Sequence, residues 1–209
     1  MHNFVIRRAS VAIAAEAHAF HVEHLTPHLW PRTAEDLLAL ASSGQLYVAY
    51  RTDGTSIVGA CYLRQSDDII TDFEFGGVCV REDARGVRLG DAVGAMALAM
   101  HVSTNVPRDG SKLIAHVHAR NKRPCGMLGR LGFTRSGSVV IPANEVPDGM
   151  EREPDGTVVG DVYGFDFGRL STIADCIDGG ATAVRFDVSP YSLSQVTEAV
   201  REIAAGGRV

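Results

Sequence analysis

Cysteine and long hydrophobic runs are scarce in this sequence of 209 residues. The 4 cysteines are widely spaced and form no CxxC pair, so the sequence predicts neither a zinc site nor a disulfide framework. The longest mostly apolar run, residues 92–100, is far shorter than the roughly 20 residues that a membrane-spanning helix needs. The N-terminus lacks the basic stretch and apolar core of a signal peptide. We therefore expect a cytoplasmic protein with reduced thiols and no membrane partner.

An excess of positive charge is also lacking. The chain has 20 Lys and Arg residues against 25 Asp and Glu residues, which gives a formal net charge of -5 and a pI near 5.9. No general positive field attracts nucleic acid, so no nucleic-acid partner is expected and any anion site must be local. Hydrophobic residues at 45% and charged residues at 22% are typical of a globular domain, which excludes a disordered or fibrous chain.

Strand and helix patterns alternate along most of the chain and predict an α/β domain over residues 1–169. The turn dipeptide Asp53-Gly54 lies between two β-rich runs and indicates an antiparallel hairpin. Thr33 and Asp36 form a capping-box pattern for a helix that Gly44 ends. The other predicted helices span residues 11–22 after Ser10 as N-cap, 89–101 and 124–131. The predicted strands are 4–6, 46–50, 57–63, 69–80, 113–118, 133–141 and 158–167.

Two segments stand outside this alternation. Residues 142–156 hold 3 prolines and many acidic residues, which predicts a loop long enough to act as a lid or a partner contact. Residues 170–209 predict a C-terminal αβα extension: a short helix, a strand over 181–188 and an amphipathic helix over 192–205. This extension could form a second small sheet, exchange between the subunits of a homodimer, or cover the acceptor site.

The segment from Gly77 to Ala92 reads as a strand, a basic glycine-containing turn and the start of a helix. Free backbone amides and the helix dipole make such a turn an anion site, and Arg85 and Arg88 add donors suited to a pyrophosphate. The segment matches neither the Walker loop nor the GxGxxG fingerprint. A plain helix cap with surface arginines is the other interpretation.

With these residues, the sequence resembles the GCN5-related N-acetyltransferase (GNAT) superfamily, whose signature is R/Q-x-x-G-x-G/A. Here it reads Arg85-Gly86-Val87-Arg88-Leu89-Gly90, with Arg88 where the family usually has its middle glycine. A later motif agrees, an asparagine after the fifth strand (Asn121) and a short helix that ends in Gly132-Phe133. The resemblance covers residues 4–167 and implies a mixed, mostly antiparallel central sheet flanked by helices.

The resemblance implies an acyltransferase that moves an acetyl or short acyl group from acetyl-CoA to an amine by direct attack in a ternary complex. The cofactor-binding residues carried over from the family are Val78, Cys79 and Val80 for pantetheine, Arg85, Gly86, Val87, Arg88, Leu89, Gly90 and Asp91 for pyrophosphate, and Asn121 for the pantetheine arm. Leu128 stands where the family often has a tyrosine acid, so a non-catalytic CoA-binding module is the alternative. A third possibility is phosphoanion binding without CoA.

Amine attack on a thioester needs a proton acceptor. Glu74 matches the position of a basic glutamate in many family members, and Asp72 lies on the same strand face, so either could be the base. Both could also be ordinary exposed carboxylates. His116 and His118 share a face of their strand and could supply a proton or line the acceptor pocket, or could simply be hydrogen-bonded strand residues.

Histidines recur at roughly three-residue spacing over residues 18–28, which invites a metal interpretation. Histidines spaced by three residues do not stay on one face of a helix, and the spacing does not match the HExxH motif, so no metal is expected. In the resembling family this region shapes the acceptor site, which makes His24, His28 and Trp30 the expected substrate contacts, together with His116. An enclosed pocket favours a small-molecule amine over a protein acceptor.

Overall fold

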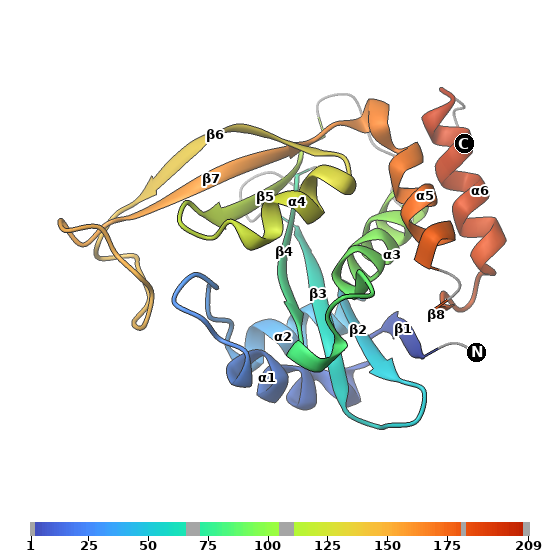
Figure 1. Ribbon diagram of the computed structural model, residues 1–209, viewed down its shortest axis with the longest axis horizontal. Helices are drawn as coiled ribbons and strands as arrows, with labels where there is room; N and C mark the ends of the chain where they lie inside the picture. The colour runs from blue at the N-terminus through green and yellow to red at the C-terminus, as the bar shows by residue number, and fades with distance from the viewer. Residues whose placement is uncertain (1–2, 66–71, 105–110, 181–182, 207–209) are drawn as a thin grey trace.

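The computed structural model describes residues 3–65, 72–104, 111–180 and 183–206. Its strands join in an eight-stranded sheet with the order β6-β7-β5-β4-β3-β2-β1-β8 (Figure 1). The strands are β1 (Phe4–Arg8), β2 (Leu46–Arg51), β3 (Ile57–Gln65), β4 (Phe73–Val80), β5 (Leu113–His118), β6 (Phe133–Ile141), β7 (Val158–Phe165) and β8 (Val184–Asp187). Parallel pairing occurs between β4 and β5 and between β1 and β8, and the other neighbours are antiparallel. The predicted mixed, mostly antiparallel sheet is confirmed.

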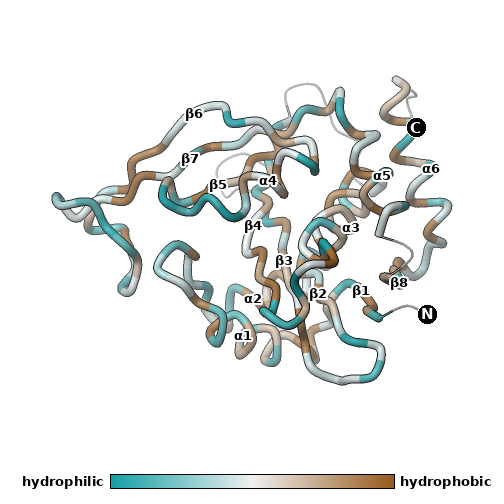
Figure 2. Tube along the Cα trace, in the orientation of Figure 1, coloured by the Kyte–Doolittle hydropathy of each residue, from teal (hydrophilic) through white to brown (hydrophobic). Residues whose placement is uncertain are grey.

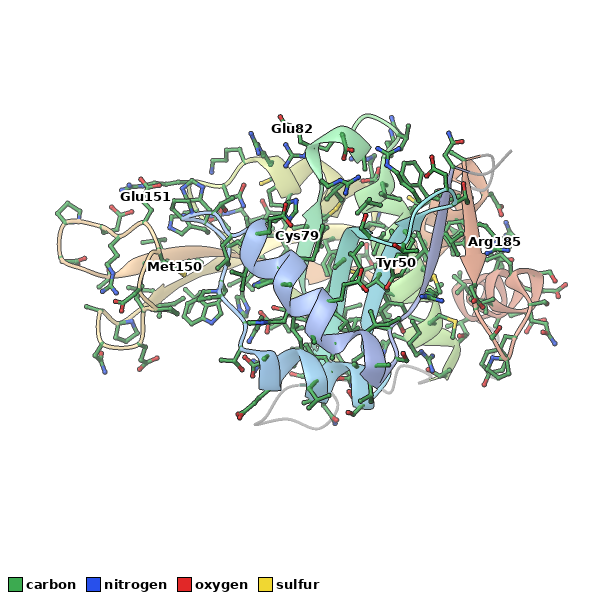
Figure 3. All side chains as sticks on the ribbon, turned by 90° about the horizontal axis from the view of Figure 1, so that it is seen from below. Tyr50, Cys79, Glu82, Met150, Glu151 and Arg185 are labelled. Carbon is green, nitrogen blue, oxygen red and sulfur yellow. The ribbon has the colours of Figure 1, made fainter. Side chains whose placement is uncertain are left out.

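Helices cover both faces of the sheet. They are α1 (Ala14–Glu23), α2 (Ala34–Ser42), α3 (Leu89–Thr104), α4 (Arg123–Arg130), α5 (Ser171–Gly180) and α6 (Leu193–Ala204). One apolar core lies between the sheet and α3 to α6, and a smaller core lies between the sheet and α1 with α2. Figure 3 looks onto the face that α1 and α2 cover. Because α3 is enclosed by the sheet, α5 and α6, its side chains are apolar on nearly every side.

Local capping signals behave as predicted at α2 but not at α1. Thr33 and Asp36 form the predicted capping box, and Gly44 follows α2 with a φ of 70°, the left-handed conformation that favours glycine. Ser10 instead precedes a short 3-10 turn, Val11–Ile13, and its side chain makes no capping bond. The predicted helix over 11–22 is therefore wrong at its start, because the first turn is wound too tightly to be α-helical.

The C-terminal extension is part of the main sheet. Strand β8 pairs in parallel with β1, so that Phe4 lies opposite Val184, and α5 and α6 pack against α3. Figure 1 shows β8 beside β1 at the right of the molecule. The predicted αβα order is confirmed, whereas a separate second sheet is wrong because β8 extends the existing one. Residues 69–71 and 181–182, which belonged to predicted strands, lie outside the described residues.

No helix in the described ranges combines the length and the apolar character that a bilayer crossing requires.

Candidate active site

The two central parallel strands diverge soon after they meet. Phe73 of β4 lies opposite Leu113 and Glu74 opposite Ile114 of β5, and no later pair joins the strands. Figure 1 shows β4 and β5 separating from this end. Beyond Glu74, β4 keeps ladder bonds only to β3, and beyond Ile114, β5 keeps them only to β7. Two backbone edges therefore face one another across the divergence with groups that can pair with a ligand.

A β-bulge in β4 lies at this divergence. Ala60 pairs with Cys79 but Tyr62 pairs with Gly76, so β4 carries an extra residue here and Gly77 has a φ of 61°. The side-chain alternation shifts by one residue: Phe75 packs with the α3 layer before the bulge and Val78 packs there after it. A Cβ atom on Gly77 would lie 2.3 Å from the Tyr62 ring. The site therefore requires glycine where the ring covers the bulge.

Glu74 lies on the face of the sheet that α1 and α2 cover, and one histidine and two arginine side chains surround it. His116 Nδ1 is 3.2 Å from Glu74 Oε1. Arg64, its cross-strand neighbour on β3, lies 3.4 Å from Oε2, and Arg32, from the segment between α1 and α2, lies 3.7 Å from the same oxygen. Arg32 also donates hydrogen bonds to the Tyr62 hydroxyl at 2.6 and 3.0 Å. The cluster joins β3, β4, β5 and the α1–α2 segment.

The charge of Glu74 is set by this cluster. Burial by itself would raise the pKa of the Glu74 carboxyl, but the hydrogen bond from His116 and the charges of Arg32 and Arg64 outweigh it, so the pKa lies below its ordinary value. Glu74 is thus ionised at neutral pH. An ionised carboxylate can hold an ammonium group, but a lowered pKa makes it a weak proton acceptor.

The other predicted acid–base residues, Asp72 and His118, are hydrogen-bonded to backbone groups of the protein. Asp72 is buried just before β4, and its carboxylate accepts a hydrogen bond from the Lys112 amide at 3.1 Å, which fixes the entry to β5. His118 is also buried: Nε2 donates to the Glu151 carbonyl at 2.9 Å and Nδ1 accepts from the Arg120 amide at 3.2 Å. His118 therefore has neither ring nitrogen available, and Asp72 acts as a local cap.

The predicted pyrophosphate turn leads directly from β4 into α3. Arg88 has a φ of 56°, so the position where the GNAT signature has glycine adopts the backbone that glycine favours, at a cost of about 1 kcal/mol. Arg88 accepts the first helical hydrogen bond of α3 from the Ala92 amide, which leaves the amides just before Ala92 without helical partners. Arg85 Nε donates to the Val80 carbonyl at the end of β4. This turn is a suitable anion site.

Helix α4 closes the other side of the divergence. A Cβ atom on Gly90 would lie 3.4 Å from Met127 Sδ and 3.8 Å from Val78, so the start of α3 lies close to both α4 and β4. The Asp91 carboxylate, a predicted cofactor residue, is bound bidentately by Arg130 at 2.7 and 2.9 Å, which ties α3 to α4. Its side chain is structural, so only its backbone amide could reach a phosphate.

Polar groups continue along the loop between β5 and α4. Asn121 is partly exposed there, among Arg120, Lys122 and Arg123, and Figure 2 shows this loop and the loop after β4 as hydrophilic.

Leu128 on α4, at the position where the GNAT family often has a tyrosine, is buried. The Tyr163 hydroxyl from β7 donates to Cys125 Sγ at 3.2 Å, and this bond, followed by burial, raises the pKa of Tyr163 to about 12.

Three of the predicted acceptor residues, His24, His28 and Trp30, lie in the α1–α2 segment (residues 24–33), and the fourth, His116, lies on β5. His24 Nδ1 bonds to the Phe20 carbonyl and so caps α1. His28 bonds to Glu151 and its ring packs 4.7 Å from that of His118. The Glu151 amide donates to the Pro27 carbonyl, which holds the β6–β7 loop (residues 142–157) against this segment (Figure 3). Trp30 lies in the same segment, partly buried.

An apolar hollow of about 190 Å³ opens between these two loops. It is lined by Leu25, Thr26, Pro27, Leu29, Pro31, Asp148, Gly149 and Met150. None of these residues belongs to the Glu74 cluster, so the hollow is a surface feature beside the site rather than its reaction centre. Among residues 3–65, 72–104, 111–180 and 183–206, no three His, Cys, Asp or Glu side chains group as metal ligands.

Sequence reasoning missed three members of the cluster: Arg32, Arg64 and Tyr62. Tyr62 and Arg64 lie on one face of β3, although the predicted strand over 57–63 ended before Arg64, so the pairing of β3 with β4 is the signal that could have found them. Arg32 lies in a loop, where no periodicity predicts its direction.

Neither a family model nor a curated protein sequence matches this chain. Many solved structures do. A GNAT-family acetyltransferase from Streptococcus pneumoniae is 19% identical with a TM-score of 0.57, over 77% of this chain and 98% of that one. A ribosomal-protein-S5-alanine acetyltransferase from Vibrio fischeri is 13% identical with a TM-score of 0.58, over 78% and 93%.

A third similar structure is a diaminobutyrate acetyltransferase from Paenibacillus lautus in complex with L-2,4-diaminobutyric acid and coenzyme A. It is 16% identical with a TM-score of 0.55, over 78% of this chain and 96% of that one. These likenesses establish the architecture: the chain has the fold of the GNAT acetyltransferases, as its two motifs indicated.

Proposed function

We propose that this protein transfers an acyl group, with acetyl as the expected one, from acyl-CoA to an amine. The observation that carries the proposal is the divergence of β4 and β5, because the unpaired edges that follow the Glu74–Ile114 pair lie next to an ionised carboxylate. A thioester held along one edge would face an amine held at Glu74. Both substrates would then be bound together with their reacting atoms in reach, as direct attack in a ternary complex requires.

Residues of β4, the turn after it and the β5–α4 loop would bind the pantetheine and the pyrophosphate of CoA. The backbone of Val78, Cys79 and Val80 can pair with the amides of pantetheine, although Arg85 already occupies the Val80 carbonyl. The turn from Arg85 to Asp91 would hold the pyrophosphate, with Arg88 supplying charge and Gly90 close approach. Asn121 would contact the pantetheine arm. The bulge at Gly77 leaves a backbone amide outside the ladder, which is the kind of donor that stabilises a developing oxyanion.

The acceptor would lie on the α1–α2 face, beside Glu74 and His116. Arg32 and Arg64 place two permanent positive charges beside one carboxylate, so an amine that also carries an anionic group would be accommodated better than a polyamine. The α1–α2 segment and the β6–β7 loop hold each other through His28 and Glu151, which supports a confined site and a small-molecule acceptor. Trp30 and His24 would border this site.

A non-catalytic CoA-binding module is the second candidate, and the observation that favours it is Leu128, which is buried in the core and can donate no proton. A CoA thiol with a pKa of about 8.5 can nevertheless leave as thiolate at a cost of roughly 2 kcal/mol at pH 7. Orientation of the reactants can offset that cost.

Thiol release from acetyl-CoA tests the proposal, with a panel of amines, amino acids and polyamines offered to the wild type and to Glu74→Gln. We expect amine-dependent release by the wild type, lost in Glu74→Gln while CoA binding is retained. Glu198→Gln removes an exposed carboxylate of α6 and is the matched control, with unchanged release. CoA binding without release for any amine would favour the non-catalytic module.

A further inference from the structure

The hydrogen bond between His116 and Glu74 fixes the tautomer of the histidine. Nδ1 of His116 lies 3.2 Å from Oε1 of Glu74. An ionised carboxylate has no proton to donate, so Nδ1 must carry the hydrogen. The neutral imidazole then has its lone pair on Nε2, on the far side of the ring from Glu74. The pair thus presents a basic nitrogen rather than a basic oxygen.

The oxygens of Glu74 are poorly placed to accept a proton themselves. Oε1 faces His116, and Oε2 faces the guanidinium groups of Arg64 and Arg32 at 3.4 and 3.7 Å. Protonation of Glu74 would leave these cations without their anion, which opposes the step. A positive charge that forms on His116, in contrast, would lie next to the carboxylate and be stabilised by it.

The position of His116 on β5 suits contact with a substrate. It follows Ile114, the last residue of β5 that pairs with β4, so it lies where the strands diverge. Its side chain is 40% exposed, on the same face of the sheet as Glu74. Within the described ranges of the chain, no protein group hydrogen-bonds to its Nε2. His118, the next residue on this face, has both ring nitrogens engaged and offers no such atom.

We propose that Nε2 of His116 is the atom that takes the proton from the acceptor's ammonium group, and that Glu74 is a positioning residue that holds the imidazole in the required tautomer. The inference rests on the proposed acyl transfer. One N–H bond of the ammonium breaks and its proton moves to Nε2. The freed lone pair forms a C–N bond with the thioester carbonyl carbon, the C–S bond breaks, and its electron pair leaves with the CoA thiolate. The surplus proton of the nitrogen passes to the thiolate through solvent, and the proton on Nε2 is released to solvent, which restores the neutral imidazole.

The groups that face this dyad come from every neighbouring element. Arg64 on β3 and Arg32 in the α1–α2 segment face Glu74, His116 itself lies on β5, and His118 follows it on the same face of that strand. The arginines keep their charge over the whole accessible pH range. The arginines therefore cannot accept the substrate's proton, which leaves His116 as the acceptor among these groups.

The test is kcat/KM for the amine against pH, for the wild type, His116→Ala, Glu74→Gln and the control His18→Ala. Two probes of similar size are used, ethylamine, which is protonated at pH 7, and trifluoroethylamine, which is already neutral. We expect His116→Ala to lose about 100-fold with ethylamine at pH 7, a loss that shrinks as pH rises, and little with trifluoroethylamine. Glu74→Gln should also lose most of kcat/KM with ethylamine, because the imidazole is no longer held in the required tautomer, and His18→Ala should match the wild type.

Equal losses with both amines would overturn the proposal, because a structural role does not distinguish them, and full activity in His116→Ala would overturn it directly. If the wild type transfers to no amine of any panel, the proposed acyl transfer itself fails. Long-range ¹⁵N NMR of the histidine rings checks the tautomer without any substrate: a proton on Nδ1 of His116, displaced in Glu74→Gln, supports the dyad. A proton on Nε2 of the neutral ring would overturn it.

Discussion

Arg130 donates two hydrogen bonds to the Asp91 carboxylate, from Nε at 2.7 Å and from Nη2 at 2.9 Å, and so ties the first turn of α3 to the last turn of α4. The Asp91 carboxylate is nearly buried, whereas the arginine is partly exposed. Arg130→Ala would leave a buried carboxylate without its partner, so we expect the free energy of unfolding to fall by about 2 kcal/mol. Chemical denaturation measures it. Arg123→Ala, on the exposed side of the same helix, should change it by less than about 0.5 kcal/mol, and equal losses would contradict the account.

Arg88 holds a left-handed backbone with a φ of 56°. Arg88→Gly and Arg88→Ala both remove the guanidinium, so their comparison isolates the backbone. We expect the glycine variant to be more stable than the alanine variant by about 1 kcal/mol, because only glycine adopts this conformation without strain. Both should bind acetyl-CoA more weakly than the wild type. Thermal unfolding with equal stability for the two variants would show that residue 88 is unstrained.

Gly77 lies under the Tyr62 ring at the bulge of β4. A Cβ there would lie 2.3 Å from the ring and on a φ of 61°, so Gly77→Ala should destabilise the fold by about 2 to 4 kcal/mol and disturb the contact of Tyr62 with Arg32. Gly137→Ala is the control, since no atom lies within 4 Å of its added methyl group. If Gly77→Ala leaves the free energy of unfolding unchanged, the bulge at Gly77 is contradicted.

Burial lowers the pKa of His101 in α3 to about 4, against roughly 6.5 in the unfolded chain. Between these values the unfolded state binds more protons than the folded state, so stability rises with pH and is lost as pH falls from about 6.5 to 4. The loss from this residue is on the order of 3 kcal/mol. We expect His101→Phe, which keeps a ring against Phe73, to flatten the acid side of the stability curve. Parallel curves for the two proteins would contradict the low pKa.

Local patterns predicted most of the elements because they are encoded within a few residues. The hairpin of β2 and β3, the capping box at Thr33 and the alternation over Leu113–His118 all appear as expected. The place of β8 beside β1 was not predictable, because parallel pairing between the two ends of the chain leaves no local pattern. The bulge at Gly77 was missed for a related reason, since only the partner strand reveals the extra residue.

The candidate site likewise contains residues that the sequence predicted and residues that only the tertiary structure reveals. Glu74 was proposed from the resemblance to the GNAT superfamily, whose members often have a basic glutamate near the start of the fourth strand, and the structure puts it at the divergence of β4 and β5. The partners that set its charge, Arg32 and Arg64, come from a loop and a neighbouring strand and required the tertiary structure. The same holds for the difference between His116 and His118, which alternate identically in the sequence but differ in their hydrogen bonds.

Binding of acetyl-CoA is the central claim, and calorimetric titration tests it most directly. Acetyl-CoA and ATP are titrated separately into the wild-type protein. The account predicts micromolar binding of acetyl-CoA and much weaker binding of ATP, because ATP can use the turn from Arg85 to Asp91 but has no pantetheine arm to pair with the free edge of β4. Equal binding of the two would indicate a phosphoanion site alone, and no binding of acetyl-CoA would contradict the account.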